Sequence, residues 1–141
     1  MPTIEAFLDV RRIFANYAAT FATLDPDAVV ALHSEDTQFW LHTGEEPVHG
    51  RDHVRQKFAA VFEQWPEFGF DVYRVIVGER HWVLDWALTA VLTDADGTTR
   101  PIRFDCLDVV EIDDRGLVTR KDTFVDLVQA QTALTPPGRF Q

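Results

Sequence analysis

Cysteine and basic residues are scarce in this chain. Of its 141 residues only Cys106 is a cysteine, so no internal disulfide can form, which excludes the disulfide-rich scaffolds of small secreted proteins. The 13 lysines and arginines stand against 23 aspartates and glutamates, which gives a formal net charge of −10. A charge of this sign repels the phosphates of nucleic acids and the anionic lipids of membrane surfaces. We therefore expect neither nucleic acid nor membrane as a partner.

Several motifs are also missing. No long uncharged apolar run marks a signal peptide or a membrane span, so we expect a cytoplasmic protein. No glycine-rich phosphate loop and no nucleophile elbow occur. The five histidines lack the spacing of metal ligands on one element; they are His33, His42, His49, His53 and His81. The sequence thus predicts neither a metal site nor a cofactor.

Apolar residues, in contrast, are plentiful. Hydrophobic residues make up 46% of the chain and aromatic residues 12%, which is enough for one domain with a sizeable core. We expect this domain to span residues 1–134, and two prolines and a glycine predict a C-terminal tail over residues 135–141. A core of this kind could be hollow enough to hold a ligand.

Apolar residues three and four positions apart predict three helices. The first spans residues 3–23 and carries Tyr17 in the middle of its apolar stripe. A short second helix begins after Asp25, a good N-cap, and ends in a turn at residues 34–36. The third occupies residues 50–65, where the following proline ends it.

The strands follow from alternation of apolar and polar residues. Strands are predicted over residues 37–43, 68–77 and 81–93, followed by a hairpin over residues 101–127 with its turn at residues 113–116. The order of helix, helix, short strand, helix and four long antiparallel strands indicates an α+β domain. Its helices pack on one face of a curved sheet.

Asp108 is the most unusual residue of the hairpin. It shares the parity of the apolar residues of its strand, which are Ile102, Phe104, Cys106, Val110 and Ile112. An isolated ionised carboxylate in apolar surroundings is very costly, so this acid must be paired, hydrogen-bonded or protonated. Asp108 is therefore the first candidate for a functional residue.

Three stretches resemble the nuclear-transport-factor-2-like superfamily, which includes SnoaL-like polyketide cyclases, ketosteroid isomerases and limonene epoxide hydrolases. They are Tyr17–Asp36, YAATFATLDPDAVVALHSED; Pro47–Phe58, PVHGRDHVRQKF; and Asp108–Leu127, DVVEIDDRGLVTRKDTFVDL. The resemblance implies a cone-shaped α+β fold of cystatin-like topology. In it a curved antiparallel sheet wraps around N-terminal helices and encloses an apolar cavity.

The resemblance also implies a site. It places Tyr17 and Asp108 where the ketosteroid isomerases have the tyrosine and the acid of an oxyanion hole, in which a protonated carboxyl donates a hydrogen bond. Leu41 occupies the position of their general base, and leucine cannot move a proton. Any base must come from another group, and the candidates are His42, Asp85 and Lys121.

Each candidate also has a structural interpretation. Tyr17 could be an ordinary core aromatic. Asp108 could be an acid paired with Lys121, which would keep it ionised and turn it from a hydrogen-bond donor into a base. His42 faces away from the cavity if its neighbour Leu41 faces inward. Asp85 could be the partner of a surface arginine, Arg74, or of a helix cap.

We predict a cofactor-independent enzyme that uses acid/base chemistry on a small, mostly apolar carbonyl compound, by isomerisation, cyclisation or dehydration. The residues expected to line its cavity are Phe39, Leu41, Phe58, Trp86, Phe104, Cys106 and Thr123. The alternative is a non-catalytic module for small-molecule binding or dimerisation. An open cavity that reaches both Tyr17 and Asp108 would favour the enzyme, and a cavity plugged by tryptophans would favour the module.

A homodimer is expected as well. The strands over residues 68–77 and 81–93 carry apolar side chains on both parities, and helices can cover only one face. A monomer would expose a larger apolar patch than soluble proteins usually tolerate. The family resemblance also implies back-to-back sheets.

Overall fold

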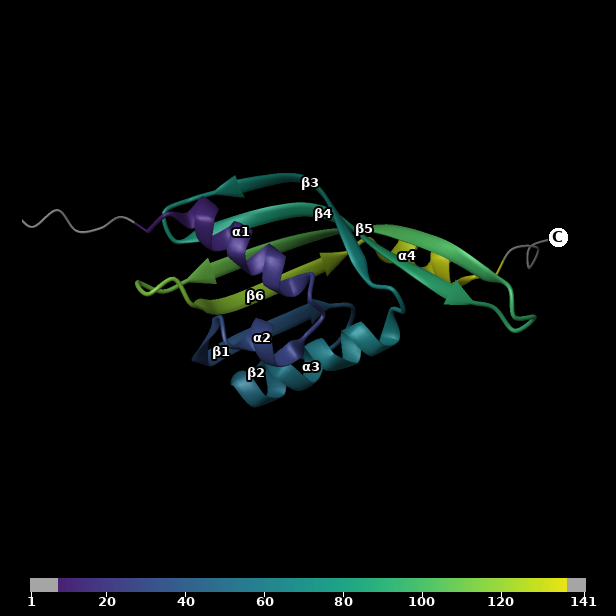
Figure 1. Ribbon diagram of the computed structural model, residues 1–141, viewed down its shortest axis with the longest axis horizontal. Coiled ribbons are helices and arrows are strands. Elements are labelled where there is room, and N and C mark those ends of the chain that lie inside the picture. Colours follow the sequence, from purple (N-terminus) through teal and green to yellow (C-terminus); the bar gives the residue numbers. More distant parts are fainter. Residues whose placement is uncertain (1–7, 137–141) are drawn as a thin grey trace, which may run out of the picture.

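A six-stranded sheet forms the frame of the molecule (Figure 1). Residues 8–136, which the computed structural model describes, form four helices and six strands. In chain order they are α1 Val10–Phe21, α2 Pro26–Val30, β1 His33–His42, β2 Val48–His49, α3 Arg51–Gln64, β3 Gly69–Val77, β4 His81–Thr93, β5 Thr99–Ile112, β6 Val118–Val125 and α4 Leu127–Leu134. The predicted start of the first helix at residue 3 lies outside the described residues.

The strands follow one another in the order β2-β1-β6-β5-β4-β3, and every neighbouring pair is antiparallel except β1 and β6. The parallel pairing of β1 with β6 places strands from distant parts of the chain side by side. Figure 1 shows α1, α2 and α3 on one side of this curved sheet. The predicted α+β class with N-terminal helices and a curved, mostly antiparallel sheet is confirmed.

Local signals position the helices. The side chain of Asp9 accepts a hydrogen bond from the backbone of Arg12 and caps α1, and Asp25 caps α2 in the same way. Gly50 precedes α3 with a φ of +84°, a conformation that glycine adopts without strain. Among residues 8–136 no helix is both long enough and apolar enough to cross a membrane.

One local prediction is wrong, and two elements were not predicted. Residues 34–36 belong to β1 and not to a turn, because the chain leaves α2 at Val30 and pairs at once with the start of β6. Residues 127–134 form α4, which was not predicted; it begins at residue 127, the expected end of the return strand, because Asp126 caps a helix there by accepting from the backbone of Gln129. The short strand β2 was also not expected; it pairs with β1 at Gln38 and Phe39.

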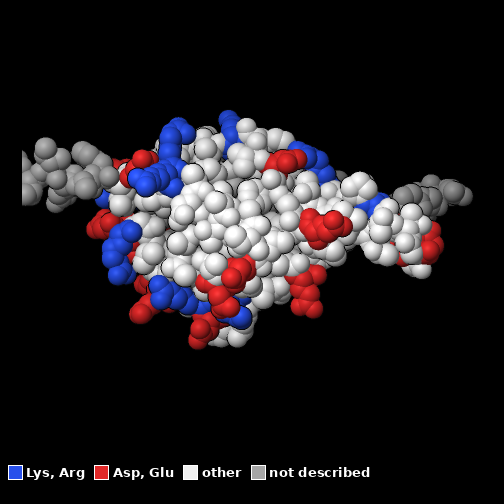
Figure 2. Space-filling model, viewed as in Figure 1, with Lys and Arg blue, Asp and Glu red and all other residues white. Residues whose placement is uncertain are grey.

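The two faces of the sheet differ. The inner face, which meets the helices, carries alternating buried residues of β4 and β5 such as Trp86 and Phe104. The outer face carries exposed apolar residues, which are Tyr73, Ile76, Leu107 and Phe124. In Figure 2, which views the molecule as in Figure 1, charged side chains of both signs gather along the rim and few lie near the centre. The curvature leaves an apolar space between the inner face and the helices.

Candidate active site

A cavity of about 250 Å³ lies between the inner face, α3 and α4. All seven residues expected to contact a substrate line it; they are Phe39, Leu41, Phe58, Trp86, Phe104, Cys106 and Thr123. Helix α4, which the sequence reading missed, supplies further wall through Ala130. Glu45 and Lys57 form an ion pair at its edge. The rest of the lining is mainly apolar, with Lys121 as the charged residue that is almost fully buried.

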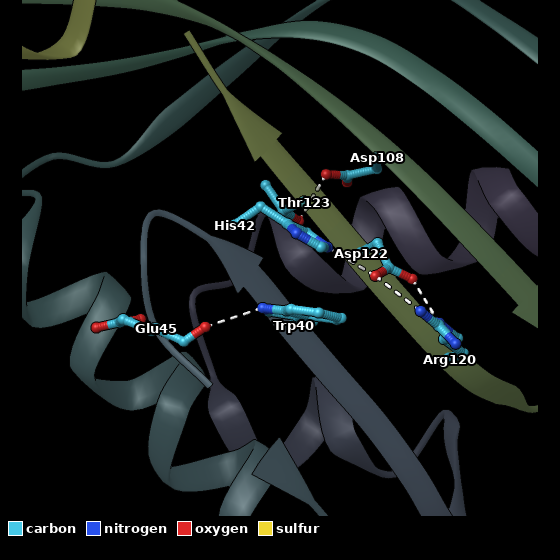
Figure 3. A network of polar contacts seen from close by, with 7 residues as sticks. All are labelled: Trp40, His42, Glu45, Asp108, Arg120, Asp122 and Thr123. Carbon is cyan, nitrogen blue, oxygen red and sulfur yellow. Dashed lines mark hydrogen bonds and ion pairs between the residues drawn. The ribbon is translucent and has the colours of Figure 1, made fainter. Parts of the chain in front are cut away.

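Lys121 and Thr123 project from β6 toward this cavity and meet Asp108 of β5. The hydroxyl of Thr123 donates to Asp108 Oδ1 over 2.8 Å (Figure 3). Lys121 Nζ lies 3.6 Å from Asp108 Oδ2. Both neighbours offer protons to the carboxyl group, so the geometry suits an ionised Asp108 that accepts hydrogen bonds. This is the paired arrangement that the sequence left open as an alternative to a protonated donor.

The amine of Lys121 is otherwise surrounded by aromatic rings. Nζ lies 4.2 Å from the ring centre of Phe21 and 4.9 Å from that of Tyr17, and Lys121 is 4% exposed. Burial lowers the pKa of Lys121, because an ammonium loses hydration there, while the negative charge of Asp108 works in the opposite direction. Lys121 therefore releases its proton more readily than an ordinary surface lysine.

Tyr17 lies in a second, smaller pocket of about 30 Å³. Asp108 lines this small pocket and not the main cavity, while Phe21, Trp86 and Lys121 line both. The expected convergence of Tyr17 and Asp108 on one substrate oxygen in the main cavity is therefore not what the structure shows. Lys121 is the polar group that connects the two spaces.

The hydroxyl of Tyr17 already has protein partners. It lies 3.4 Å from Lys121 Nζ and 2.9 Å from His33 Nε2. Since an ammonium can only donate, the phenol accepts from Lys121 and its own proton is left for His33. Burial, with the added charge of Asp108, raises the pKa of Tyr17 well above its usual range, so the phenol stays neutral.

His33 is a member of this network that the sequence reading missed. It is fully buried, and its Nδ1 lies 2.9 Å from the hydroxyl of Thr37. Burial lowers the pKa of His33 to about 3, helped by the charges of Lys121 and Arg51, so the imidazole is neutral. The sequence does place His33 on the same strand parity as Thr37 and Leu41, which could have predicted its burial. The turn predicted at residues 34–36 excluded His33 from that strand.

His42 and Asp85, two of the candidate bases, lie on the outer face. His42 Nε2 contacts Asp122 Oδ1 at 2.8 Å (Figure 3), and its ring stacks between Trp40 and Phe124. Asp85 lies 3.2 Å from Arg74. Neither lines the main cavity or the pocket of Tyr17, because the inward parity of β1 and β4 belongs to their neighbours. Lys121 is the one of the three that reaches the cavity.

The tryptophans do not plug the cavity. Trp40 packs on the outer face, and Trp82 packs against Tyr17 with ring centres 5.5 Å apart. Trp86 forms part of the cavity wall, and its buried Nε1 donor has no hydrogen-bond partner among residues 8–136. A buried donor without a partner is unfavourable, and this one is closed off from the cavity as well as from solvent.

The remaining groups give no indication of a metal. Within residues 8–136 no cluster of three or more histidine, cysteine, aspartate or glutamate side chains is arranged to hold a metal ion. Cys106 lines the cavity, but burial, aided by the charge of Asp108, raises the pKa of its thiol to about 12. The groups available for chemistry are thus the amine of Lys121, which lines the cavity, and the carboxyl group of Asp108 and the phenol of Tyr17, which lie next to that amine.

Several solved structures of other proteins resemble this chain. Among solved structures, a candidate SnoaL-like polyketide cyclase from Jannaschia sp. CCS1 is 20% identical with a TM-score of 0.74, covering 91% of this chain and 92% of that one. One from Shewanella putrefaciens CN-32 is 11% identical with a TM-score of 0.78, covering 90% and 86%. SalBIII, an epoxide hydrolase/cyclase-like enzyme in pyran ring formation in polyether salinomycin, is 18% identical with a TM-score of 0.72, covering 85% and 92%.

The TM-scores show that these proteins share the fold of this chain, and the low sequence identities show nothing more. None of the curated proteins compared with the chain matches it. The sequence itself matches the family described as SnoaL-like domain over residues 14–121. Because this match spans most of the 141 residues, the chain belongs to the family of SnoaL-like domains.

Proposed function

We propose that this protein is a cofactor-independent enzyme that uses acid/base chemistry on a small, mostly apolar carbonyl compound. The observation that carries the proposal is the buried amine of Lys121, which lines an apolar cavity and pairs with Asp108 behind it. An amine whose pKa is lowered by burial gives up its proton more readily than an ordinary lysine, and only the deprotonated amine can act as a base. Cyclisation and epoxide hydrolysis, the reactions named for the fold relatives, also require proton transfer.

The geometry suits removal of a proton next to a carbonyl group. In its neutral form Lys121 takes this proton, and the ammonium that forms is stabilised by Asp108, which lies 3.6 Å away. Thr123 holds the carboxyl group of Asp108 in place. Isomerisation, cyclisation and dehydration can all begin with this step.

The cavity limits the size of the substrate. Its volume of about 250 Å³ lies below the roughly 300–1,000 Å³ of pockets for drug-sized ligands. Aromatic and aliphatic walls favour an apolar skeleton. We therefore expect a compact ketone or aldehyde with few other polar groups.

A non-catalytic binding module is the alternative, and one observation favours it. Leu41 lines the cavity at the position where the resemblance places a general base. A cavity without a base would bind a ligand and leave it unchanged.

Hydrogen exchange in a simple ketone separates these functions. Cyclohexanone dissolved in D₂O should exchange its α-hydrogens faster with the protein than in buffer alone, as followed by proton NMR. Lys121→Met should remove about 10²-fold or more of this acceleration. Lys121→Arg is a second variant, which keeps the positive charge but cannot act as a base. Arg120→Met, the neighbouring position on the outer face, is the matched control and should exchange like the wild type.

Two results would overturn the proposal. Cyclohexanone that quenches tryptophan fluorescence but shows no accelerated exchange would indicate a binding module. Acceleration that persists in both Lys121 variants would place the base elsewhere.

A further inference from the structure

The chain contains only two lysines, Lys57 and Lys121, and their surroundings differ. The side chain of Lys57 is 23% exposed and pairs with Glu45 at the edge of the cavity. Lys121 is 4% exposed and lies deep in the same cavity. The amine of Lys57 is thus partly solvated and paired with a carboxylate. The amine of Lys121 is buried and lines the space in which a ligand would lie.

The contacts of Lys121 do not tie down its amine. Nζ lies 3.4 Å from the hydroxyl of Tyr17 and 3.6 Å from Asp108 Oδ2, both longer than the usual 2.7–3.2 Å of a hydrogen bond to nitrogen. The rings of Phe21 and Phe58, whose centres lie 4.2 and 5.5 Å from Nζ, attract the ammonium form, but they hold the neutral amine only weakly because it carries no charge. A small rotation of the side chain could therefore turn Nζ toward a ligand without breaking a short bond.

We propose that Lys121 is also a nucleophile, whose amine forms a reversible imine with the carbonyl carbon of a ligand held in the cavity. The inference rests on the proposed function, because it requires that the cavity takes a carbonyl compound. It goes beyond that function, because an acid/base enzyme forms no covalent bond to its substrate.

The step balances within the described groups. The ammonium of Lys121 first passes one proton to Asp108, and the neutral amine attacks the carbonyl carbon. A C–N bond forms, the electron pair of the C=O bond moves to oxygen, and a second proton passes from nitrogen to that oxygen. Asp108, which lies beside the nitrogen and not in the cavity, returns its proton to that nitrogen, the nitrogen passes a further proton to the oxygen, the C–O bond breaks, and water leaves. The product is a protonated imine beside an ionised Asp108, so the net charge is unchanged.

The surroundings favour this chemistry at Lys121. A lysine desolvated in an apolar pocket is a recognised form of activated amine nucleophile, and burial lowers the pKa here. The charged and titratable groups within reach of its amine are Asp108 and Tyr17, which can pass protons, while neutral His33 lies beyond the phenol. Cys106 is the competing nucleophile in the cavity, but a thiol whose pKa is raised to about 12 carries almost no thiolate.

Reductive trapping tests the inference. Benzaldehyde has no α-hydrogen and so cannot report acid/base exchange; it is added to the full-length protein, and sodium cyanoborohydride then reduces any imine to a stable secondary amine. Mass spectrometry of the intact protein and its peptides should find one benzyl group on Lys121, with Lys57 unmodified in the same molecules. Lys121→Arg should give no adduct at residue 121, and the comparison with Lys57 needs no variant to fold.

The outcomes separate the inference from the proposed function. Benzaldehyde that quenches tryptophan fluorescence without labelling Lys121, while cyclohexanone still exchanges, would overturn the imine and leave the acid/base function standing. Equal labelling of Lys57 and Lys121 would also overturn it, since the chemistry would not depend on the cavity. Failure of both binding and exchange would remove the proposed function and the imine with it.

Discussion

Strand β6 carries two cation–carboxylate networks on its opposite faces. On the outer face Arg120 Nε lies 2.7 Å from Asp122 Oδ2, and His42 approaches the same carboxyl group (Figure 3). On the inner face Lys121 Nζ lies 3.6 Å from Asp108 Oδ2. The outer contacts are shorter and better formed, but the side chain of Arg120 is 44% exposed. The inner contact is looser, almost dry and next to a cavity.

The charges respond differently on the two faces. Burial by itself would raise the pKa of Asp122, but hydrogen bonds from Arg120 and His42 outweigh it and lower that pKa. On the inner face burial dominates and lowers the pKa of Lys121. Short hydrogen bonds from two partners, one of them half-exposed, keep the buried Asp122 ionised, whereas desolvation of the amine beside a cavity makes its proton easier to release. A position next to the cavity and a desolvated amine, more than a short distance between charges, therefore mark the reactive site.

The largest expected difference between the faces is in stability. Lys121→Met should lower the free energy of unfolding by about 3–5 kcal/mol, because Asp108 would remain buried without its cation. Arg120→Met should cost about 1 kcal/mol or less, because Arg120 is half-exposed and Asp122 keeps His42 as a partner. Urea denaturation measures both. The double variant Lys121→Met with Asp108→Asn should recover part of the loss, and equal costs for the two single variants would contradict the contrast.

The second-largest expected effect is on the rate of hydrogen exchange in cyclohexanone, which should distinguish Asp108 from Asp122. Asp108→Asn should slow exchange of cyclohexanone by about 10²-fold, because the ammonium formed on Lys121 loses its counter-charge. Asp122→Asn on the outer face should have little effect on this rate, with thermal unfolding of both variants as the control. An Asp108→Asn protein with wild-type exchange would instead favour a neutral hydrogen-bond donor at this position, as in the oxyanion hole that the resemblance implied.

Much of the inner face could be predicted from the sequence. The alternation of β5 placed Phe104 and Asp108 on one face, and the family resemblance made Lys121 a candidate for the site. These inferences succeed because a strand with one buried face fixes which side chains point inward.

The rest depends on tertiary contacts. His33 was assigned to the neighbourhood of a turn because its burial arises from parallel pairing with Val118 of β6, far away in the sequence. The wall supplied by α4 was missed because its short apolar sequence also fits a strand end. The partners of Tyr17 could not be inferred either, since its hydroxyl contacts side chains from two other strands.

A smaller effect, on the free energy of unfolding as the pH falls, should distinguish the buried His33 from His42 on the outer face. His33 has a pKa of about 3 in the folded protein against 6.5 ordinarily, so between these values the unfolded chain binds more protons than the folded one. The stability contributed by neutral His33 is complete above pH 6.5 and is lost as the pH falls, by about 1.4 kcal/mol per pH unit.

Urea denaturation between pH 4.5 and 6.5, a window inside the limits set by His33, measures this slope. His33→Gln should flatten it, and His42→Gln controls for loss of a histidine on the outer face. An unchanged slope in His33→Gln would show that other groups cause it.

The smallest effect on exchange is expected from the apolar patch of the outer face. We propose that Tyr73, Ile76, Leu107 and Phe124, all exposed, pack against a second copy of the chain. Ile76→Asp should yield monomers without changing the exchange rate. Sedimentation equilibrium of the wild type at micromolar concentration would contradict the dimer if it gave a mass near 16.1 kDa.

The central claim is that Lys121 is a desolvated amine in a ligand cavity, and NMR can observe it directly. Protein labelled with ¹³C at lysine Cε contains only two labelled side chains, so Lys57 provides the reference signal. Lys121 should titrate below the range of an ordinary lysine, and addition of cyclohexanone should shift its signal while leaving that of Lys57 in place. A Lys121 signal that titrates in the ordinary range and does not respond to the ketone would contradict the account.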